Sequence, residues 1–206
     1  MPDSPLTERA TGVILAGGKN SRMGGREKAF LRVEGRTILE RTVELLRRAF
    51  PDVLVVANAP EKYAAFGVRV VRDEIPGAGP LGGIHAALGA VATPYVFAVA
   101  CDMPYLRLEP IAHLLGYLRD QEAVIPEWEG DIEPLHAFYA TRIRVRIEGA
   151  IARGVRSIRD FLPAISVTYV SESEMRSVEG AAESFCNVNT PEDAARFRVV
   201  AEHPSC

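Results

Sequence analysis

A glycine-rich segment near the amino terminus carries two cations at a spacing that suits a polyphosphate. Residues 15–28 read LAGGKNSRMGGREK and contain Gly17, Gly18, Arg22 and Lys28. Glycines leave backbone N–H groups free to surround phosphate oxygens. An arginine can donate to two phosphate oxygens at once, and a lysine adds a point charge. The segment has neither the Gly-Lys-Ser/Thr ending of a Walker A loop nor GxGxxG spacing. A glycine pair alone is more typical of a surface loop, but the whole string predicts a triphosphate site.

A carboxylate and two amides form a second candidate group. Asp102 follows the most apolar run, residues 95–101, and Pro104 prevents that strand from continuing. Mg²⁺ prefers one or two protein ligands plus substrate phosphates, so Asp102 could hold it. A single Asp more often caps a turn, and in the segment with Asn187 and Asn189 either Thr190 or Asn189 would by itself more often simply cap the last helix. Taken together, the carboxylate and the amide oxygens predict a Mg²⁺ site of low charge.

Two further groups are less informative. The segment GPLGG at residues 79–83 opens a predicted helix, where Gly82 and Gly83 would let a substrate phosphate approach the helix amino terminus. A tight turn with close helix packing explains these glycines equally well. His85 and His136 have no metal-ligand partners at suitable spacing, so we expect them to be structural or at most substrate contacts.

The elements that must position these residues alternate between strands and helices. Residues 171–184 are polar and predict a loop, and Thr37 to Glu40 fits a capping box at a helix start. Apolar runs predict strands at residues 11–16, 53–57, 68–71, 95–101, 122–125, 134–139 and 165–170. Helices are expected at residues 60–66, 81–91, 108–121, 142–152 and 157–162. Two further helices are expected to begin at Thr37 and at Thr190.

This alternation predicts an α/β fold with a mainly parallel sheet and helices on both faces. In such folds ligands bind beyond the carboxyl ends of the strands. The Gly17 loop, Asp73 and Asp102 all fall at strand ends. The residue types that chemistry would need therefore converge on one edge of the predicted sheet.

Composition bounds the class of protein. The 206 residues suit a single domain over 1–206, with 1–10 expected to be flexible, and 48% hydrophobic residues suffice for a sizeable core. A net charge of −3 from 24 basic and 27 acidic residues argues against a general nucleic-acid or membrane binder. A polar amino terminus and no long apolar stretch predict a cytoplasmic protein. The 3 cysteines suit neither a disulfide framework nor a zinc motif, and Cys101 is expected in the core.

The string LAGGKNSRMGGREKAFL resembles the signature of nucleotidyltransferases that activate sugar phosphates and cofactors. Four later segments, GPLGGI, ACDMPYL, EPLHAFY and NVNTPED, resemble the molybdenum cofactor guanylyltransferases in order and spacing, over nearly the whole chain. AGG in place of AAG, together with NVNTPED, favours the guanylyl over the cytidylyl branch. The resemblance implies a three-layer, Rossmann-like nucleotidyltransferase fold with a mainly parallel, mixed sheet.

Carried over by position, the resemblance implies a set of site residues. Catalytic roles fall to Arg22, Lys28 and Asp102, and Mg²⁺ would be held by Asp102 with Asn189. The pterin substrate would face Gly82, Gly83 and Asn187. The nucleotide would bind Leu15, Ala16, Gly17, Gly18, Lys28, Asn58, Asp73 and Asp102.

The implied reaction is transfer of GMP from GTP to the terminal phosphate of molybdopterin or molybdenum cofactor, with release of pyrophosphate. Such a transfer needs in-line positioning and charge neutralisation, and an already ionised phosphate nucleophile needs no general base. Transient contact with molybdenum-inserting and molybdoenzyme-maturation proteins is also implied. Two alternatives stay open: a related cytidylyl- or sugar-phosphate nucleotidyltransferase, and a nucleotide-binding regulator without turnover.

Overall fold

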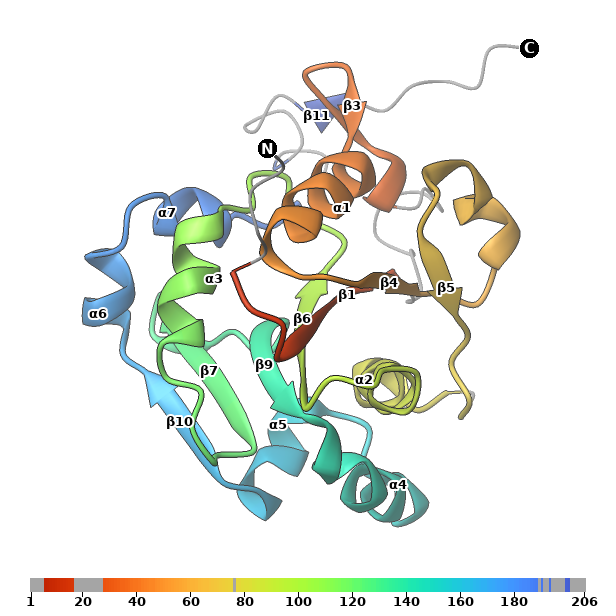
Figure 1. The fold of residues 1–206 in the computed structure, drawn as a ribbon, viewed down its shortest axis with the longest axis vertical. Helices are drawn as coiled ribbons and strands as arrows, with labels where there is room; N and C mark the ends of the chain where they lie inside the picture. Colours follow the sequence, from red (N-terminus) through yellow and green to blue (C-terminus); the bar gives the residue numbers. More distant parts are fainter. Residues whose placement is uncertain are drawn as a thin grey trace.

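An eight-stranded sheet forms the centre of the molecule, with helices on both faces (Figure 1). The computed structural model describes residues 6–16, 28–75, 77–188, 190, 193 and 199–200. In space the strands follow the order β10-β7-β9-β6-β1-β4-β5, and β8 pairs with β7. Their bounds are β1 Ala10–Leu15, β4 Val53–Val56, β5 Arg69–Val71, β6 Tyr95–Ala100, β7 Ala123–Trp128, β8 Asp131–Ile132, β9 His136–Ala140 and β10 Val167–Val170.

The sheet is mixed, and its parallel part carries the strand ends of interest. β6, β1, β4 and β5 run parallel to one another, as does β10 to β7, whereas β9 is antiparallel to both β6 and β7. The carboxyl ends of the four parallel neighbours therefore meet at one edge. This arrangement confirms the predicted mixed, mainly parallel sheet.

Seven α-helices and four short 3₁₀ helices connect the strands in the described part of the chain. The 3₁₀ helices are η2 Lys28–Phe30, η3 Pro60–Phe66, η4 Thr141–Ile143 and η5 Leu162–Ala164. The α-helices are α1 Ile38–Ala49, α2 Gly79–Gly89, α3 Leu108–Leu115, α4 Arg144–Ala152, α5 Ile158–Phe161, α6 Glu172–Arg176 and α7 Ala181–Ser184.

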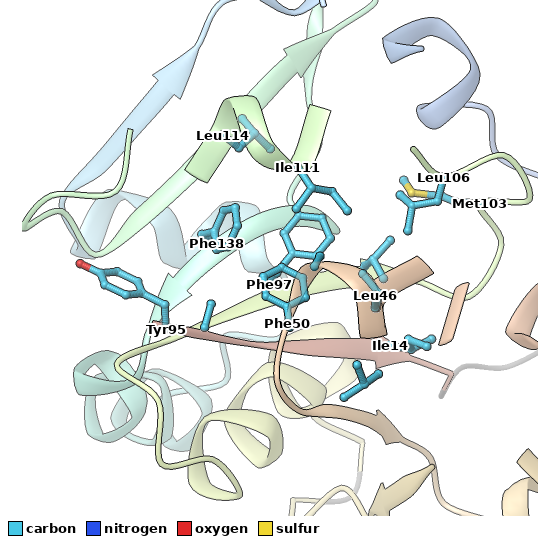
Figure 2. Close-up of a cluster of buried hydrophobic side chains, with 14 of the residues drawn as sticks. Ile14, Leu46, Phe50, Tyr95, Phe97, Met103, Leu106, Ile111, Leu114 and Phe138 are labelled. Atoms are coloured by element: carbon cyan, nitrogen blue, oxygen red, sulfur yellow. The ribbon is translucent and has the colours of Figure 1, made fainter. Parts of the chain in front are cut away.

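One apolar layer lies between the sheet and the helices α1 and α3. Ile14 of β1 and Phe97 of β6 pack there with Leu46 of α1 and Ile111 of α3, all of them fully buried (Figure 2). Phe97 also lies 5.0 Å, centroid to centroid, from Phe138 of β9. Full burial of one such side chain is worth about 1.5–3 kcal/mol, so this layer contributes strongly to holding α1 and α3 on the sheet.

The second apolar layer lies on the opposite face. Val13 and Leu15 of β1 point into it, and Leu81 of α2 and Ile147 of α4 cover them. Residues 13 and 14 thus enter different layers, as the period of two in a strand requires. The three-layer architecture expected from the sequence is confirmed.

A small sheet lies beside the main one and was not expected. β2 (Arg32–Val33) and β3 (Arg36–Thr37) form a hairpin, and β11 (Val199–Val200) pairs with β2. The turn between β2 and β3 places Glu34 at φ 52° and Gly35 at φ 82°. Two successive residues with positive φ suit a tight hairpin turn, so the Glu-Gly pair is its sequence signal.

The predicted loop over residues 171–184 is wrong, because the segment contains α6 and α7. Ser171 caps α6: its hydroxyl accepts from the Glu174 N–H, and the Glu174 carboxylate accepts from the Ser171 N–H. Both helices are short and bury little apolar surface, with Met175 the buried member of α6. Capping, more than an apolar face, explains why such a polar segment is helical.

Some observed helix ends differ from the predicted ones by several residues. α3 ends at Leu115, well before the expected residue 121, since Gly116 follows and turns take over. The capping box of α1 is confirmed, with the Thr37 and Glu40 side chains each accepting from the other's backbone N–H. Cys101 is half-buried and packs against the first apolar layer. Within the described residues, no helix is long and apolar enough to cross a membrane.

Candidate active site

The end of β1 sets the centre of the candidate site. The Ala16 N–H donates to the Val56 carbonyl at 3.0 Å, and the Cys101 N–H donates to the Leu15 carbonyl at 3.3 Å. These bonds continue the pairing of β1 with β4 and β6 up to Ala16, the last described residue before Gly17. Gly17, Gly18 and Arg22, which the sequence places in the phosphate site, lie outside the described residues.

Lys28 and Asp102 meet at the carboxyl end of β6. The Lys28 Nζ lies 2.9 Å from the Asp102 Oδ2, and the two side chains are only 18% and 17% exposed. A charge-assisted hydrogen bond in so sheltered a place is stronger than a surface ion pair. The structure thus brings the predicted phosphate-binding lysine and the predicted metal ligand together.

The carboxyl-terminal part of the chain forms a hydrogen bond with the backbone of Asp102. Its carbonyl accepts from the Val188 N–H at 2.9 Å, which brings the neighbouring Asn187 to the same edge of the sheet. The Asn187 amide donates to the Phe185 carbonyl at 3.4 Å. Asn189 lies outside the described residues.

Thr190 and Asp193 exchange the two hydrogen bonds of a capping box. The Asp193 N–H donates to the Thr190 hydroxyl at 3.1 Å, and the Thr190 N–H donates to the Asp193 carboxylate at 2.9 Å. Thr190 is therefore occupied as a cap, as one of the two interpretations of this segment predicted.

Asn58 and Asp73 lie together at the ends of β4 and β5. The Asp73 N–H donates to the Asn58 Oδ1 at 3.3 Å, and the Ile75 N–H donates to the Asp73 Oδ1 at 3.0 Å. Asn58 is exposed and Asp73 half-buried. Both side chains can therefore reach a ligand at this edge while their loops stay anchored.

The amino-terminal turn of α2 packs between Asp73 and β1. A Cβ on Gly82 would lie 3.0 Å from each carboxylate oxygen of Asp73, and one on Gly83 would lie 3.3 Å from a methyl group of Leu15. Close packing is thus present at both glycines. The amino terminus of α2 nonetheless lies at the edge of the sheet that holds Asp73. Close packing of Gly82 and Gly83 is therefore compatible with a position of these glycines beside substrate.

Glu133 is a residue of this edge that sequence reasoning did not single out. Burial raises its pKa to about 7, and the negative charges of Asp131, Asp102 and Glu129 add to that effect while Arg159 opposes it. Its signal in the sequence was a carboxylate directly before an apolar strand, in the segment EPLHAFY.

The two histidines are structural, as one interpretation predicted. His136 is fully buried between Phe97 and Phe185, with ring centroids at 5.2 and 4.6 Å, and burial lowers its pKa to about 3. A neutral imidazole in an aromatic stack suits the core. His85 is buried in α2, and its Nδ1 lies 3.8 Å from the nearest oxygen of Glu74.

This arrangement can bind a polyphosphate beside a base. Asn58 and Asp73 offer polar groups on the β4–β5 side, Lys28 supplies a cation, and Asp102 supplies a carboxylate. Within the described residues no cluster of three or more His, Cys, Asp or Glu could hold a metal by itself. Asp102 alone still suits Mg²⁺, which takes few protein carboxylates when phosphates supply other oxygens.

Comparisons with known proteins identify the family of this chain. A family model described as the MobA-like NTP transferase domain matches residues 12–167. A molybdenum cofactor guanylyltransferase of Syntrophotalea carbinolica is 39% identical over 90% of this chain and 89% of its own, and one of Desulfosudis oleivorans is 35% identical over 90% and 93%.

A solved structure extends the likeness to three dimensions. Molybdopterin-guanine dinucleotide biosynthesis protein A of Archaeoglobus fulgidus superposes with a TM-score of 0.79 at 29% identity, covering 91% of this chain and 96% of that one. Most of β1, the Asp73 loop, α2 and the Lys28–Asp102 pair fall within residues 12–167, which the family model matches. The chain belongs to the MobA-like NTP transferase family.

Proposed function

We propose that this chain, acting as a single domain, transfers GMP from GTP to the terminal phosphate of molybdopterin or molybdenum cofactor. A phosphate oxygen of the acceptor forms a bond to the α-phosphorus of GTP, the bond from that phosphorus to the β-phosphate oxygen breaks, and pyrophosphate leaves with the bonding electrons. The observation that carries the proposal is the sheltered Lys28–Asp102 pair at the strand edge that also holds Asn58 and Asp73. The relatives named above support the choice of substrates.

The residues of this chain position and neutralise the reactants. Lys28, with Gly17, Gly18 and Arg22, would bind the phosphates and offset the charge that accumulates on them. Asn58 and Asp73 would contact the nucleoside, while Gly82, Gly83 and Asn187 would face the pterin. The acceptor phosphate is already ionised at neutral pH, so the reaction requires positioning more than a base.

Mg²⁺ fits the donor set. The carboxylate of Asp102 already faces a cation, the Lys28 ammonium at 2.9 Å, which supports the placing of positive charge there. Asp102, with Asn189 as a proposed partner, would hold the ion. When bound, Mg²⁺ would neutralise phosphate charge and orient the α-phosphate. Contact with molybdenum-inserting and maturation proteins belongs to the same proposal, because the product must reach an apoenzyme.

The test is a panel of GTP, CTP, ATP and UTP with purified molybdopterin, read by pyrophosphate release and by product mass. We expect the guanine dinucleotide product with GTP and poor competition from CTP, since a site that hydrogen-bonds one base leaves polar groups unpaired with another. Omitting molybdopterin gives the control for simple GTP hydrolysis. Equal or better kcat/KM with CTP would overturn the base assignment, and no product with any nucleotide would overturn the reaction.

A further inference from the structure

Glu133 occupies a defined position at the active-site edge. It follows β8 and precedes β9, its N–H donates to the Pro126 carbonyl at 2.9 Å, and its carbonyl accepts from the His136 N–H at 3.2 Å. The Ala100 N–H donates to the Leu135 carbonyl at 3.1 Å, which extends the β6–β9 pairing toward Asp102. The backbone of Glu133 is therefore held near the residue that follows β6.

The carboxylate of Glu133 has no partner among the residues that the structure describes. It is half-buried, and among the described residues it makes no hydrogen bond or ion pair. Arg159, whose charge reaches it, is occupied with the Asp131 carboxylate and with the Ile132 carbonyl at 2.7 Å. Burial raises the pKa of Glu133 to about 7. A carboxylate that is costly to bury and unpaired is typical of a group that awaits a ligand.

The order of the strands places Glu133 on the acceptor side of the site. Across the sheet the order is β9-β6-β1-β4-β5, so Asp102 after β6 lies between Glu133 before β9 and the pair Asn58 and Asp73 after β4 and β5. The nucleoside of GTP is assigned to the β4–β5 side. Asn187, assigned to the acceptor, follows Phe185, whose ring lies 4.6 Å, centroid to centroid, from His136 of β9. This packing favours an approach of the acceptor to Asp102 from the β9 side. Within the described part of the chain, Glu133 is a carboxylate without a partner on that side of Asp102.

The chemistry of a pterin matches this group. The pyrimidine edge of a pterin presents a ring N–H beside an exocyclic amino group, two parallel donors that one carboxylate can accept together, as it does from a guanidinium fork. We infer that Glu133 accepts these two hydrogen bonds and selects the 2-amino-4-oxo ring of the acceptor. The inference rests on the proposed function, because it assigns a specificity residue to the same site.

The substitution Glu133→Gln tests this assignment. It keeps the size of the side chain but turns an amide N–H₂ toward donors. We expect the KM for molybdopterin to rise by about 10–100-fold, since a charged hydrogen-bonding partner is lost, while the KM for GTP and the Mg²⁺ requirement stay unchanged. Glu127→Gln on the neighbouring strand β7, where Glu127 pairs with Ile132 of β8, makes the same charge change at a residue with no assigned role and should leave all three quantities unchanged.

A second measurement does not depend on turnover. We would measure binding of 6-hydroxymethylpterin and of 6-hydroxymethyllumazine, in which an oxo group replaces the 2-amino group. Wild type should bind the pterin at least about 10-fold more tightly, because the lumazine turns an acceptor toward the carboxylate, and Glu133→Gln should lose that preference.

The outcomes separate this inference from the proposed function. Guanylyl transfer by wild type with an unchanged KM for molybdopterin in Glu133→Gln overturns the role of Glu133 alone, as does equal binding of the pterin and the lumazine by wild type. A raised Mg²⁺ requirement in Glu133→Gln would make Glu133 a metal ligand and also overturn the assignment. Absence of any transfer by wild type overturns the proposed function, and the binding comparison still decides on Glu133. If Glu133→Gln does not fold, the same comparison on wild type decides.

Discussion

The carboxylate of Asp73 lies directly against the Cα of Gly82. A Cβ built on Gly82 would lie 3.0 Å from both carboxylate oxygens and 2.6 Å from the Cβ of Ala78. Asp73 is also tied to Asn58 and Ile75 by hydrogen bonds. Gly82 therefore sets how closely the Asp73 loop approaches α2, and with it the place of a side chain proposed to contact the nucleoside.

Gly82→Ala should weaken GTP binding more than it weakens folding. The added methyl group must displace Ala78, the residue before α2, because contacts under 3.0 Å are not sustained, and it also leaves the Asp73 carboxylate at a tight 3.0 Å that only a shift of Asp73 relieves. We expect the KM for GTP to rise by about 10-fold, which corresponds to about 1.4 kcal/mol, with a smaller effect on kcat. Steady-state kinetics with GTP as the varied substrate checks this prediction.

Gly149→Ala is the matched control for that variant. Gly149 lies within α4, and a Cβ there would meet only the Arg153 Nη1 at an ordinary 3.6 Å. Alanine should stabilise the helix by about 0.5–1 kcal/mol and leave GTP binding unchanged. Similar KM values for GTP in Gly82→Ala and Gly149→Ala would contradict a role for the close approach at Gly82.

Lys28→Ala should fold normally and lose turnover. The lysine is partly sheltered and forms an ion pair with Asp102, so removal of its charge leaves that carboxylate less compensated. If Lys28 offsets charge in the transition state, kcat should fall by about 10²–10³-fold. Lys28→Arg keeps the charge and should recover part of the rate. Recovery should be incomplete because a planar guanidinium binds phosphate oxygens with a different geometry from an ammonium group. Wild-type kcat for Lys28→Ala at saturating GTP would remove Lys28 from the mechanism.

Asp102→Asn separates a metal ligand from a turn residue. The Val188 N–H bonds to the Asp102 backbone carbonyl, which asparagine keeps, so the melting temperature should change little. Loss of the negative charge should lower turnover by about 10³-fold, or about 4 kcal/mol, and raise the Mg²⁺ concentration needed for half-maximal rate. A fully active Asp102→Asn enzyme at ordinary Mg²⁺ would restrict Asp102 to a structural role.

Local signals in the sequence predict the parallel half of this fold well. Short undivided apolar runs identify β1, β4 and β6, because buried strands flanked by helices have no exposed face. Strand ends then place Asn58, Asp73 and Asp102 at one edge without knowledge of side-chain contacts. The capping box at Thr37 is equally readable, since both of its hydrogen bonds are local.

Features that depend on non-local pairing could not be predicted in the same way. The antiparallel direction of β9 is fixed by its bonds to β6 and β7, not by its own residues. The contact of Lys28 with Asp102 spans 74 positions. The pKa of Glu133 is raised by its burial in the folded protein, with the charge of Asp102 adding to the effect, and composition cannot reveal that burial. By contrast, the Ser171 to Glu174 capping box was visible in the sequence, but α6, with Met175 as its one buried residue, gave no helical periodicity.

The pH dependence of stability should reveal the cost of burying Glu133. Its pKa is about 7 in the folded protein against an ordinary value of 4.5, with burial as the largest cause; Asp131, Asp102 and Glu129 add to the shift and Arg159 opposes it. Because the folded state holds the proton more tightly, the associated stability is fully present below pH 4.5 and is lost as pH rises through 7. The shift corresponds to at most about 3 kcal/mol.

Glu133→Gln removes the titration, so its free energy of unfolding relative to wild type should increase between pH 4.5 and 7 and level off above that range. Urea unfolding of both proteins from pH 4.5 to 8.5, with Glu127→Gln as the control, measures this difference. A difference that is independent of pH, or one that grows as pH falls, would show that the Glu133 carboxylate is not strained by burial. Greater stability of Glu133→Gln at pH 8 together with weaker pterin binding would identify a group retained for ligand recognition at the expense of folding.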